Sequence, residues 1–185
     1  MRPPVVITGA AGFIGRNVVA ALNSRGLTDL VLVDRLGADE RWRNLRGLAF
    51  EDILAPEALL ARIEAGRAPV PSVVIHLGAC SSTIERDAAF LLENNYRCTQ
   101  SLCAWAIGCG ARFVYASSAA TYGDGSQGYS DADDRLPSLR PLNMYGYSKH
   151  LFDLWAHRHG LFDRIVGLKY FNVYGPYEDH KGDMC

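Results

Sequence analysis

The chain has 185 residues, and 49% of them are hydrophobic, which is enough for the core of one soluble globular domain. Its 19 basic and 20 acidic residues give a net charge of −1, which excludes a general attraction to nucleic acid or to an anionic membrane surface. The five cysteines lack the spacings of a zinc site, so we expect reduced, buried thiols and no metal.

The first residues, MRPPVVITGAAGF, lead directly into a strand and a glycine turn. They lack the basic region, apolar stretch and cleavage site of a signal peptide. No apolar run approaches the ~18 residues needed to span a bilayer. We therefore expect a cytoplasmic protein.

Short β-branched runs alternate with longer helical patterns along the chain. The predicted strands are 5–8, 30–34, 48–52, 72–79, 112–118 and 165–173, and the predicted helices are 13–25, 56–66, 86–107 and 145–159. This alternation favours an α/β fold, a doubly wound parallel sheet with helices on both faces. Residues 123–142 are rich in Gly, Ser, Asp and Pro, which predicts a long loop of a length that is often functional.

A glycine pattern, TGAAGFIG, lies between the first predicted strand and the first predicted helix. In a dinucleotide site Gly9 would permit the tight turn, Gly12 would let the backbone approach a pyrophosphate, and Gly15 would let the helix pack on the strand. The alternative is a structural turn that binds nothing. The position between strand and helix favours the dinucleotide site.

The residues that follow the second strand bear on which dinucleotide is bound. Asp34 lies about twenty residues after the glycine turn, where a carboxylate would accept hydrogen bonds from the adenosine ribose of NAD. Arg35, Arg41 and Arg43 could instead hold the 2′-phosphate of NADP, or could simply lie in a solvated loop. Asp52 ends the predicted third strand, where it could contact adenine or cap the strand.

Tyr145 and Lys149 lie four residues apart at the start of a predicted helix, and only Lys169 and Lys181 are lysines besides Lys149. Residues four apart share a helix face, so the phenol and the amine can point into one pocket. A nearby cation would stabilise the phenolate and lower the phenol pKa, which lets Tyr145 take a proton from a hydroxyl while hydride leaves for a nicotinamide. The alternative is a surface tyrosine near a surface lysine.

The fifth predicted strand ends in ASSAATYG. Ligands sit at the carboxyl edge of a parallel sheet, so Ser117, Ser118 or Thr121 could donate a hydrogen bond to a substrate oxygen.

The motifs TGAAGFIG, SSAATYG and YGYSK are together similar to those of the extended short-chain dehydrogenase/reductase superfamily, whose members act largely on nucleotide sugars. More narrowly, HLGACSST, NNY, PLNMYGYSK and YFNVYGPYEDHKG resemble the ADP-L-glycero-D-manno-heptose 6-epimerase family of lipopolysaccharide core biosynthesis. The resemblance runs from Val5 to Met184. It implies that residues 1–185 are an NAD(P)-binding Rossmann domain, a fragment of a longer epimerase whose C-terminal substrate lobe is missing.

The resemblance also implies the chemistry. Such enzymes hold NADP, sometimes NAD, oxidise C6 of the heptose to a transient carbonyl, and return the hydride to the other face. Tyr145 and Lys181 match the two proton-handling residues, Ser118 is the serine that meets the substrate oxygen, and Asn172 matches a substrate contact. We expect a homo-oligomer when the protein is full length. The residues that match cofactor contacts are Phe13, Ile14, Asp34, Arg35, Arg41, Leu77, Gly78, Ala79, Cys80, Ser81, Asn94, Tyr145, Lys149 and Val173.

Three departures leave alternatives open. Asp183 replaces a small hydroxyl residue after HKG, Arg41 stands where a lysine is frequent, and the chain stops where the family continues. The chain could therefore belong to another NAD(P)-dependent nucleotide-sugar epimerase or dehydratase, although SSAATYG lacks the acid pair of a dehydratase. It could also be a fragment that binds a dinucleotide without catalysis.

Overall fold

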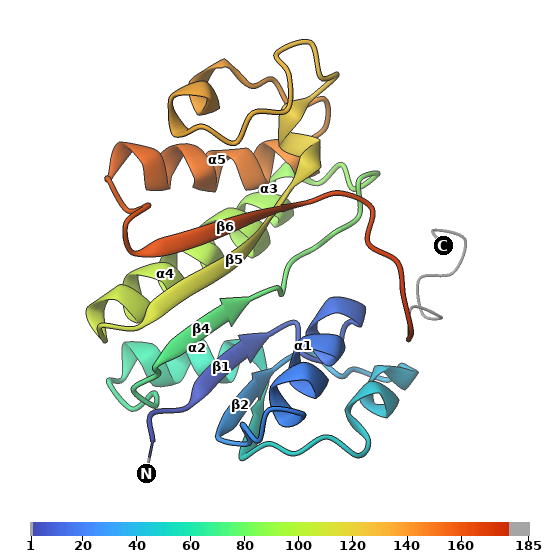
Figure 1. The fold of residues 1–185 in the computed structure, drawn as a ribbon, viewed down its shortest axis with the longest axis vertical. Helices are drawn as coiled ribbons and strands as arrows, with labels where there is room; N and C mark the ends of the chain where they lie inside the picture. Colours follow the sequence, from blue (N-terminus) through green and yellow to red (C-terminus); the bar gives the residue numbers. More distant parts are fainter. Residues whose placement is uncertain (1, 178–185) are drawn as a thin grey trace. The chain divides into compact units, whose positions relative to one another are not determined.

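A computed structural model describes residues 2–177 of the chain. Its strands form one sheet in the order β3-β2-β1-β4-β5-β6 (Figure 1), and the pairs β1–β2, β1–β4 and β2–β3 are parallel. This is the strand order of a doubly wound nucleotide-binding sheet, so the predicted fold class is confirmed. The strands are β1 (Val5–Thr8), β2 (Leu30–Val33), β3 (Asp52–Leu54), β4 (Val73–His76), β5 (Arg112–Ser118) and β6 (Ile165–Tyr170).

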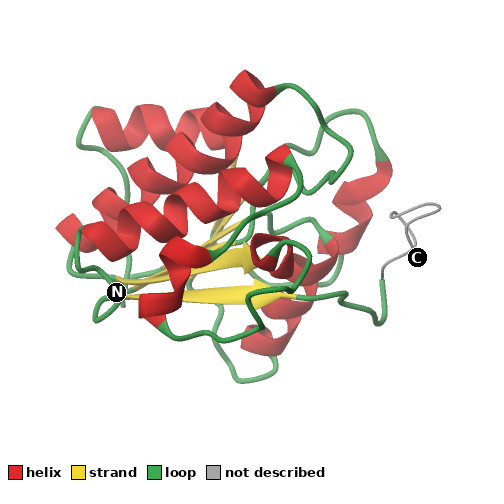
Figure 2. Cartoon of the chain, turned by 90° about the horizontal axis from the view of Figure 1, so that it is seen from above, coloured by secondary structure: helices red, strands yellow, loops and turns green. Residues whose placement is uncertain are grey.

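Helices alternate with the strands along the chain, and Figure 2 draws the helices in red and the strands in yellow. The region predicted as a helix over 86–107 is divided, because six residues in its middle form a π-helix, labelled η2. The α-helices are α1 (Phe13–Asn23), α2 (Pro56–Glu64), α3 (Ala88–Leu91), α4 (Cys98–Gly108) and α5 (Met144–Arg158). The π-helix is η2 (Leu92–Arg97), and the 3₁₀ turns are η1 (Glu40–Leu45), η3 (Ala119–Tyr122) and η4 (Asp133–Ser138).

The predicted third strand, 48–52, is wrong. The strand that pairs with β2 is Asp52–Leu54, with Val31 opposite Asp52 and Val33 opposite Leu54. The apolar side chains of Leu48 and Phe50, which suggested a strand, instead pack from a loop against the neighbouring core.

Two other predicted boundaries also change. The fourth strand ends at His76 rather than at residue 79, because the chain turns at Gly78 to pass Gly9 closely. The predicted loop 123–142 contains η4, so it is not wholly irregular.

The chain forms two compact units. Among the described residues, the first unit comprises 2–78, 105–113 and 173–177, and the second comprises 79–104 and 114–172. Strand β5 begins in the first unit and continues in the second. The glycine turn therefore belongs to the first unit, and Tyr145 with Lys149 belongs to the second.

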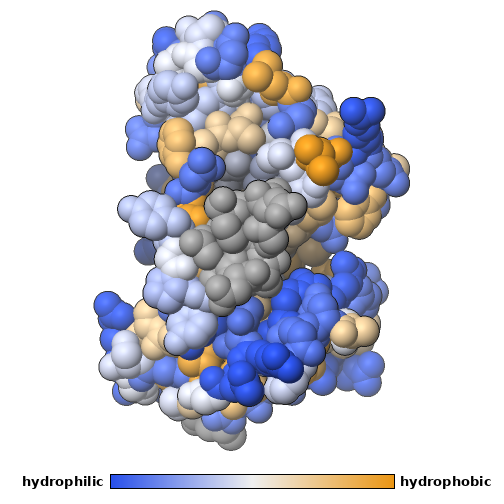
Figure 3. All heavy atoms as spheres, turned by 90° about the vertical axis from the view of Figure 1, so that its right-hand side faces the viewer, coloured by the Kyte–Doolittle hydropathy of each residue, from blue (hydrophilic) through white to orange (hydrophobic). Residues whose placement is uncertain are grey.

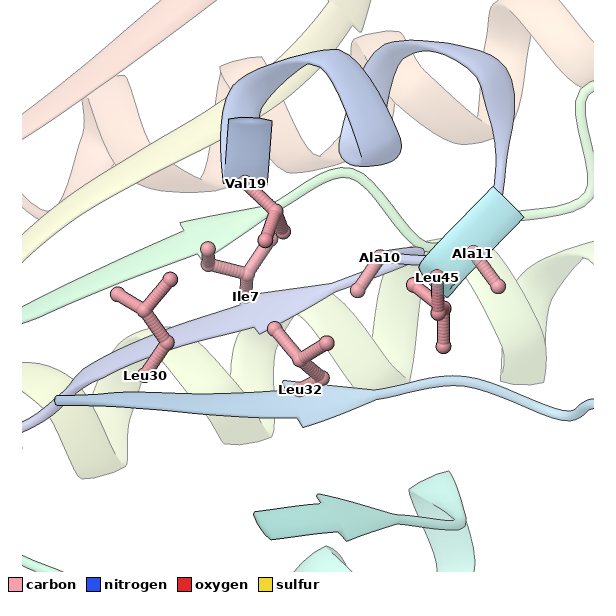
Figure 4. Packing of buried hydrophobic residues seen from close by; sticks show 7 residues of the cluster. All are labelled: Ile7, Ala10, Ala11, Val19, Leu30, Leu32 and Leu45. Carbon is pink, nitrogen blue, oxygen red and sulfur yellow. The ribbon is translucent and has the colours of Figure 1, made fainter. Parts of the chain in front are cut away.

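The core of the first unit lies between α1 and the strands β1 and β2 (Figure 4). All four residues of β2 are buried, as expected for a parallel strand covered on both faces. Val19 of α1 packs with Ile7 and Leu32, and this contact places the start of α1 beside the turn that follows β1. The cluster consists of Ile7, Ala10, Ala11, Val19, Leu30, Leu32 and Leu45.

Within residues 2–177, no helix combines the length and the apolar character needed to cross a bilayer. The face drawn in Figure 3 shows hydrophobic side chains scattered among hydrophilic ones.

Candidate functional site

The glycine turn between β1 and α1 admits no side chains at two of its three glycines. Gly9 has a φ of +68°, and a Cβ there would lie 2.7 Å from the Gly78 nitrogen. A Cβ on Gly15 would lie 2.0 Å from the Gly9 carbonyl oxygen, closer than atoms can approach. Gly9 therefore permits the turn, and Gly15 lets α1 start directly against it, as the pattern predicted.

The N-terminus of α1 fits the pyrophosphate of a dinucleotide. Gly12 is the N-cap residue, no side chain caps the helix, and its first turn carries no carboxylate. A Cβ on Gly12 would lie 3.3 Å from the Gly9 oxygen, so a side chain at this N-cap position would be crowded by the turn. An uncapped helix N-terminus favours an anion, and Phe13 and Ile14 form the turn that would face it.

Asp34 links the end of β2 to the glycine turn. Its carboxylate accepts a hydrogen bond from the backbone nitrogen of Ala11 at 2.8 Å and another from that of Arg35 at 2.8 Å. Burial raises the pKa of Asp34, and these two backbone hydrogen bonds oppose the rise. Asn44, which the sequence did not single out, donates to the Ala11 oxygen at 2.8 Å and supports the turn from η1.

The arginines near Asp34 are paired with acidic side chains. The Arg35 Nε donates to Glu57 Oε1 at 2.7 Å, and the Arg41 Nε donates to Asp39 Oδ2 at 2.7 Å. Both pairs are exposed to solvent, so each contributes little to stability and can exchange its partner. The acidic partners were missed, because charge counting along the sequence does not show which side chains meet.

Asp52 does not lie where the sequence predicted. It opens β3 instead of ending the third strand, and its carboxylate lies 3.5 Å from the Arg62 Nη1. Its contact with adenine stays a prediction.

The run Leu77–Ser81 follows β4 and passes from the first unit into the second. In the first unit, the Leu77 nitrogen donates to the Thr8 carbonyl at 3.1 Å, and the Gly78 nitrogen donates to the Thr8 hydroxyl at 3.0 Å. These bonds hold Gly78 against the glycine turn. His76 is buried and lies 2.6 Å from the same hydroxyl through Nδ1, which makes it a partnered strand-end histidine.

In the second unit, Asn95 fixes the next part of this run. Asn95 is 1% exposed; its Oδ1 accepts from the Cys80 nitrogen at 2.9 Å, and its Nδ2 donates to the Cys80 oxygen at 3.0 Å and to the Ser148 hydroxyl at 3.1 Å. Asn94, which is predicted to contact the cofactor, is half-buried and donates to Asn95 at 3.1 Å, and its cofactor contact stays a prediction. Asn95 therefore anchors the loop after β4 from the π-helix η2, a role that the motif NNY did not indicate.

Tyr145 meets Ser118 at the start of α5. The Asn143 side chain caps this helix by accepting from the Gly146 nitrogen at 2.7 Å. A Cβ on Gly146 would lie 2.7 Å from the Ala120 oxygen, so glycine lets α5 approach the turn after β5. Burial raises the pKa of the Tyr145 phenol, and the nearby Ser118 side chain partly opposes that rise.

Lys149 lies one turn later on α5 and is 7% exposed. Its amine donates to the Ala116 carbonyl of β5 at 2.9 Å. Burial lowers its pKa to about 8, against the opposing effect of Asp153 and of two nearby cysteines. Burial makes the net direction of the Tyr145 pKa upward, and the lowering contribution comes from Ser118. The expectation that Lys149, together with a bound nicotinamide, lowers this pKa stays a prediction.

The other two hydroxyl candidates, Ser117 and Thr121, donate hydrogen bonds to other groups. Ser117 donates to the Asp153 carboxylate at 2.8 Å, and Thr121 donates to the Ser118 carbonyl at 2.8 Å. Ser118 is therefore the one of the three that faces Tyr145. Lys169 forms a largely buried ion pair with Asp153 at 3.0 Å.

A cleft of about 410 Å³ lies in the second unit beside the start of α5. Asn143 and Met144 line it and directly precede Tyr145 in the chain. The remaining lining residues are Thr83, Ile84, Glu85 and Arg86, just after the predicted contacts Ala79, Cys80 and Ser81. Its lining residues are neighbours in the sequence of predicted site residues and include none of them.

The remaining predicted residues lie near the end of the described chain. Asn172 is exposed and is the last residue of the second unit, and Val173 is half-buried in the first. The segment after Val173 contacts α1, where Asn17 donates to the Pro176 oxygen at 3.1 Å. Lys181 lies outside the described residues.

Curated relatives match almost the whole chain. It is 53% identical over 180 residues to the ADP-L-glycero-D-manno-heptose-6-epimerase of Nitratidesulfovibrio vulgaris, covering 97% of this chain and 56% of the relative. It is 43% identical over 183 residues to the enzyme of the same name from Cupriavidus pinatubonensis, covering 98% of this chain and 54% of that one. The chain thus spans little more than half the length of these relatives.

Solved structures agree with the sequence relatives. The Helicobacter pylori ADP-L-glycero-D-manno-heptose-6-epimerase matches with a TM-score of 0.83 at 27% identity, over 98% of this chain and 59% of that one. The Thermus thermophilus UDP-glucose 4-epimerase in complex with NAD matches with a TM-score of 0.73 at 28% identity, over 97% and 58%.

The family model described as the NAD dependent epimerase/dehydratase family matches residues 5–185. The match contains the glycine turn of the first unit and the Ser118, Tyr145 and Lys149 set of the second. The chain belongs to the NAD dependent epimerase/dehydratase family.

Proposed function

We propose that the chain is the dinucleotide-binding part of a nucleotide-sugar epimerase that inverts C6 of an ADP-linked heptose. The observation that carries the proposal is that buried Ser118 ends β5 beside the start of α5, where Tyr145 lies, and that the buried Lys149 amine follows one turn further along α5. Identity of 53% to a protein named as this epimerase supports the choice of sugar.

The chain's residues have distinct tasks in this reaction. A bound nicotinamide dinucleotide would supply the hydride acceptor and donor. Ser118 holds the reacting substrate oxygen by a hydrogen bond, and Tyr145 takes the proton from that oxygen during oxidation. The buried Lys149 amine places a positive charge near the phenol, and its bond to Ala116 fixes where that charge lies. Lys181, by the resemblance, handles the proton on the opposite face.

We propose NADP as the cofactor, with NAD as the alternative. The first unit would hold it on the uncapped start of α1, with Asp34 near the adenosine ribose. Arg35 and Arg41 supply the cations that a 2′-phosphate requires, and their acidic partners are exposed enough to be displaced. The negative charges of these partners, Glu57 and Asp39, favour NAD instead, because NAD lacks the 2′-phosphate.

Replacing Tyr145 tests the proposal in the full-length protein. Tyr145→Phe removes only the phenol oxygen, so cofactor binding, followed by nicotinamide fluorescence, should persist. Interconversion of the two C6 epimers should fall by about 10²- to 10⁴-fold, the usual contribution of a general acid–base. Tyr147→Phe is the matched control, because Tyr147 lies on the same helix with its ring exposed, and it should retain activity.

Two outcomes would count against the proposal. Full activity of Tyr145→Phe would remove the mechanism. Binding of the dinucleotide by the wild-type full-length protein with no epimerisation of any sugar nucleotide would leave a binding module in place of an enzyme.

A further inference from the structure

Asp153 is buried in the second unit and is not explained by cofactor or substrate binding. It lies on α5, one turn after Lys149, and is 2% exposed. Its Oδ1 accepts from the Tyr115 hydroxyl at 2.7 Å. Its Oδ2 accepts from the Ser117 hydroxyl at 2.8 Å and lies 3.0 Å from the Lys169 amine. A buried carboxylate with this many partners is strongly ordered.

The two hydroxyls lie on either side of one residue of β5. Tyr115 and Ser117 flank Ala116, and the Ala116 carbonyl accepts the hydrogen bond from the Lys149 amine at 2.9 Å. Asp153 thus ties β5 to α5 at both neighbours of the carbonyl on which Lys149 rests. Moving β5 by a fraction of an ångström would misplace that carbonyl and the amine with it.

The charged groups around Lys149 also support a role for Asp153. Asp153 is the acidic residue of α5, and it shares a helix face with Lys149 because the two are four residues apart. The other groups that act on Lys149 are the thiols of Cys80, after β4, and Cys98, on α4. Lys169 of β6 shares the same carboxylate and contacts the Tyr122 ring at 4.9 Å.

We propose that Asp153 is a positioning residue that holds the Ala116 carbonyl in place and supplies the counter-charge for the Lys149 ammonium. The proposal rests on the proposed function for its effect on catalysis, because Lys149 then acts on Tyr145. A neutral Lys149 would no longer favour the phenolate, so a smaller fraction of Tyr145 would be ionised and able to take the proton. The arrangement itself can be tested without turnover.

The first measurement is the titration of the Lys149 amine by NMR of lysine labelled with ¹³C at Cε. The 185 residues contain only three lysines, so the Lys149 signal is identified by its loss in Lys149→Arg. In the wild type we expect a midpoint of about 8, and in Asp153→Asn a lower one, because the opposing charge is gone. Asp163→Asn, an exposed aspartate of the same unit, should leave it unchanged.

A second variant separates the charge from general damage to the buried network. Lys169→Gln also breaks the ion pair, but it leaves the carboxylate with Lys149 as its remaining lysine neighbour. The Lys149 midpoint should therefore rise in Lys169→Gln and fall in Asp153→Asn. A fall or no change in Lys169→Gln, or no change in a folded Asp153→Asn, overturns the proposal. If Asp153→Asn does not fold, Lys169→Gln decides alone.

Activity provides a separate readout in the full-length protein. Asp153→Asn should lower kcat at least tenfold and leave the dissociation constant of the dinucleotide within about twofold, whereas Asp153→Glu, which keeps the charge, should recover part of kcat. An unchanged kcat would overturn the proposal. If the wild type shows no epimerisation, the proposed function fails, while the lysine titration still decides the role of Asp153.

Discussion

Replacing Lys149 by methionine should stabilise the protein while removing its proposed activity. Burial lowers the pKa of the Lys149 amine from its ordinary 10.5 to about 8. The charged amine is therefore disfavoured in the folded state by about 3 kcal/mol well below pH 8, since each unit of pKa corresponds to about 1.4 kcal/mol. Methionine has a similar volume and no charge.

One favourable contact is lost in the variant. The amine donates to the Ala116 carbonyl, and removing that bond costs about 1 kcal/mol. The expected net gain in the free energy of unfolding is thus about 2 kcal/mol near pH 7. Urea unfolding measures it from the midpoint and slope. Arg158→Met, at an exposed position of the same helix, should stay within about 0.5 kcal/mol of the wild type.

The pH dependence is the sharper part of the test. The folded-state pKa lies below the unfolded one, so the unfolded chain binds more protons between about pH 8 and 10.5. Wild-type stability should rise with pH across this window, and the advantage of Lys149→Met should shrink by about 2 kcal/mol between pH 7 and 9.5. A variant that is less stable near pH 7, with a difference that does not change with pH, would refute the reasoning.

Two further predictions concern the first unit. Gly15→Ala should destabilise the protein by more than about 2 kcal/mol and abolish dinucleotide binding by calorimetry, because its Cβ would overlap the Gly9 oxygen, whereas Gly108→Ala, in open space, should be neutral or stabilising. Glu57→Gln should tighten binding of 2′,5′-ADP about two- to fivefold relative to 5′-AMP by freeing Arg35 for the 2′-phosphate, and Glu64→Gln on the same helix should not. Unchanged relative affinity in Glu57→Gln would show that Arg35 lies away from the phosphate.

Local sequence patterns were sufficient to predict those parts of the fold that depend only on neighbouring residues. The strand, glycine turn and helix around Gly9 could be read directly, because a tight turn and a close helix approach each demand glycine. Boundaries were less certain: Leu48 and Phe50 have the composition of a strand, yet only pairing with β2 decides where β3 begins.

In the second unit, the hydrogen-bond partners of the site residues could not be predicted from the sequence. The spacing of Tyr145 and Lys149 along one helix was visible, but the partners of each side chain were not. Lys149 donates to a carbonyl 33 residues earlier, and the Asp153 carboxylate accepts hydrogen bonds from two hydroxyls of β5. The resemblance already favoured Ser118, and the structure adds that Ser117 bonds to Asp153 and Thr121 to the Ser118 carbonyl.

The sequence by itself determined the α/β class, the dinucleotide turn and the residue types of the proposed redox set, because hydrophobic period and glycine placement are local properties. Only the tertiary structure decided that Asn95 rather than Asn94 anchors the loop after β4, that Arg35 meets Glu57, and that burial raises the pKa of Tyr145. These outcomes depend on side chains far apart in the chain, whose hydrogen bonds and desolvation exist only once the fold has brought them together.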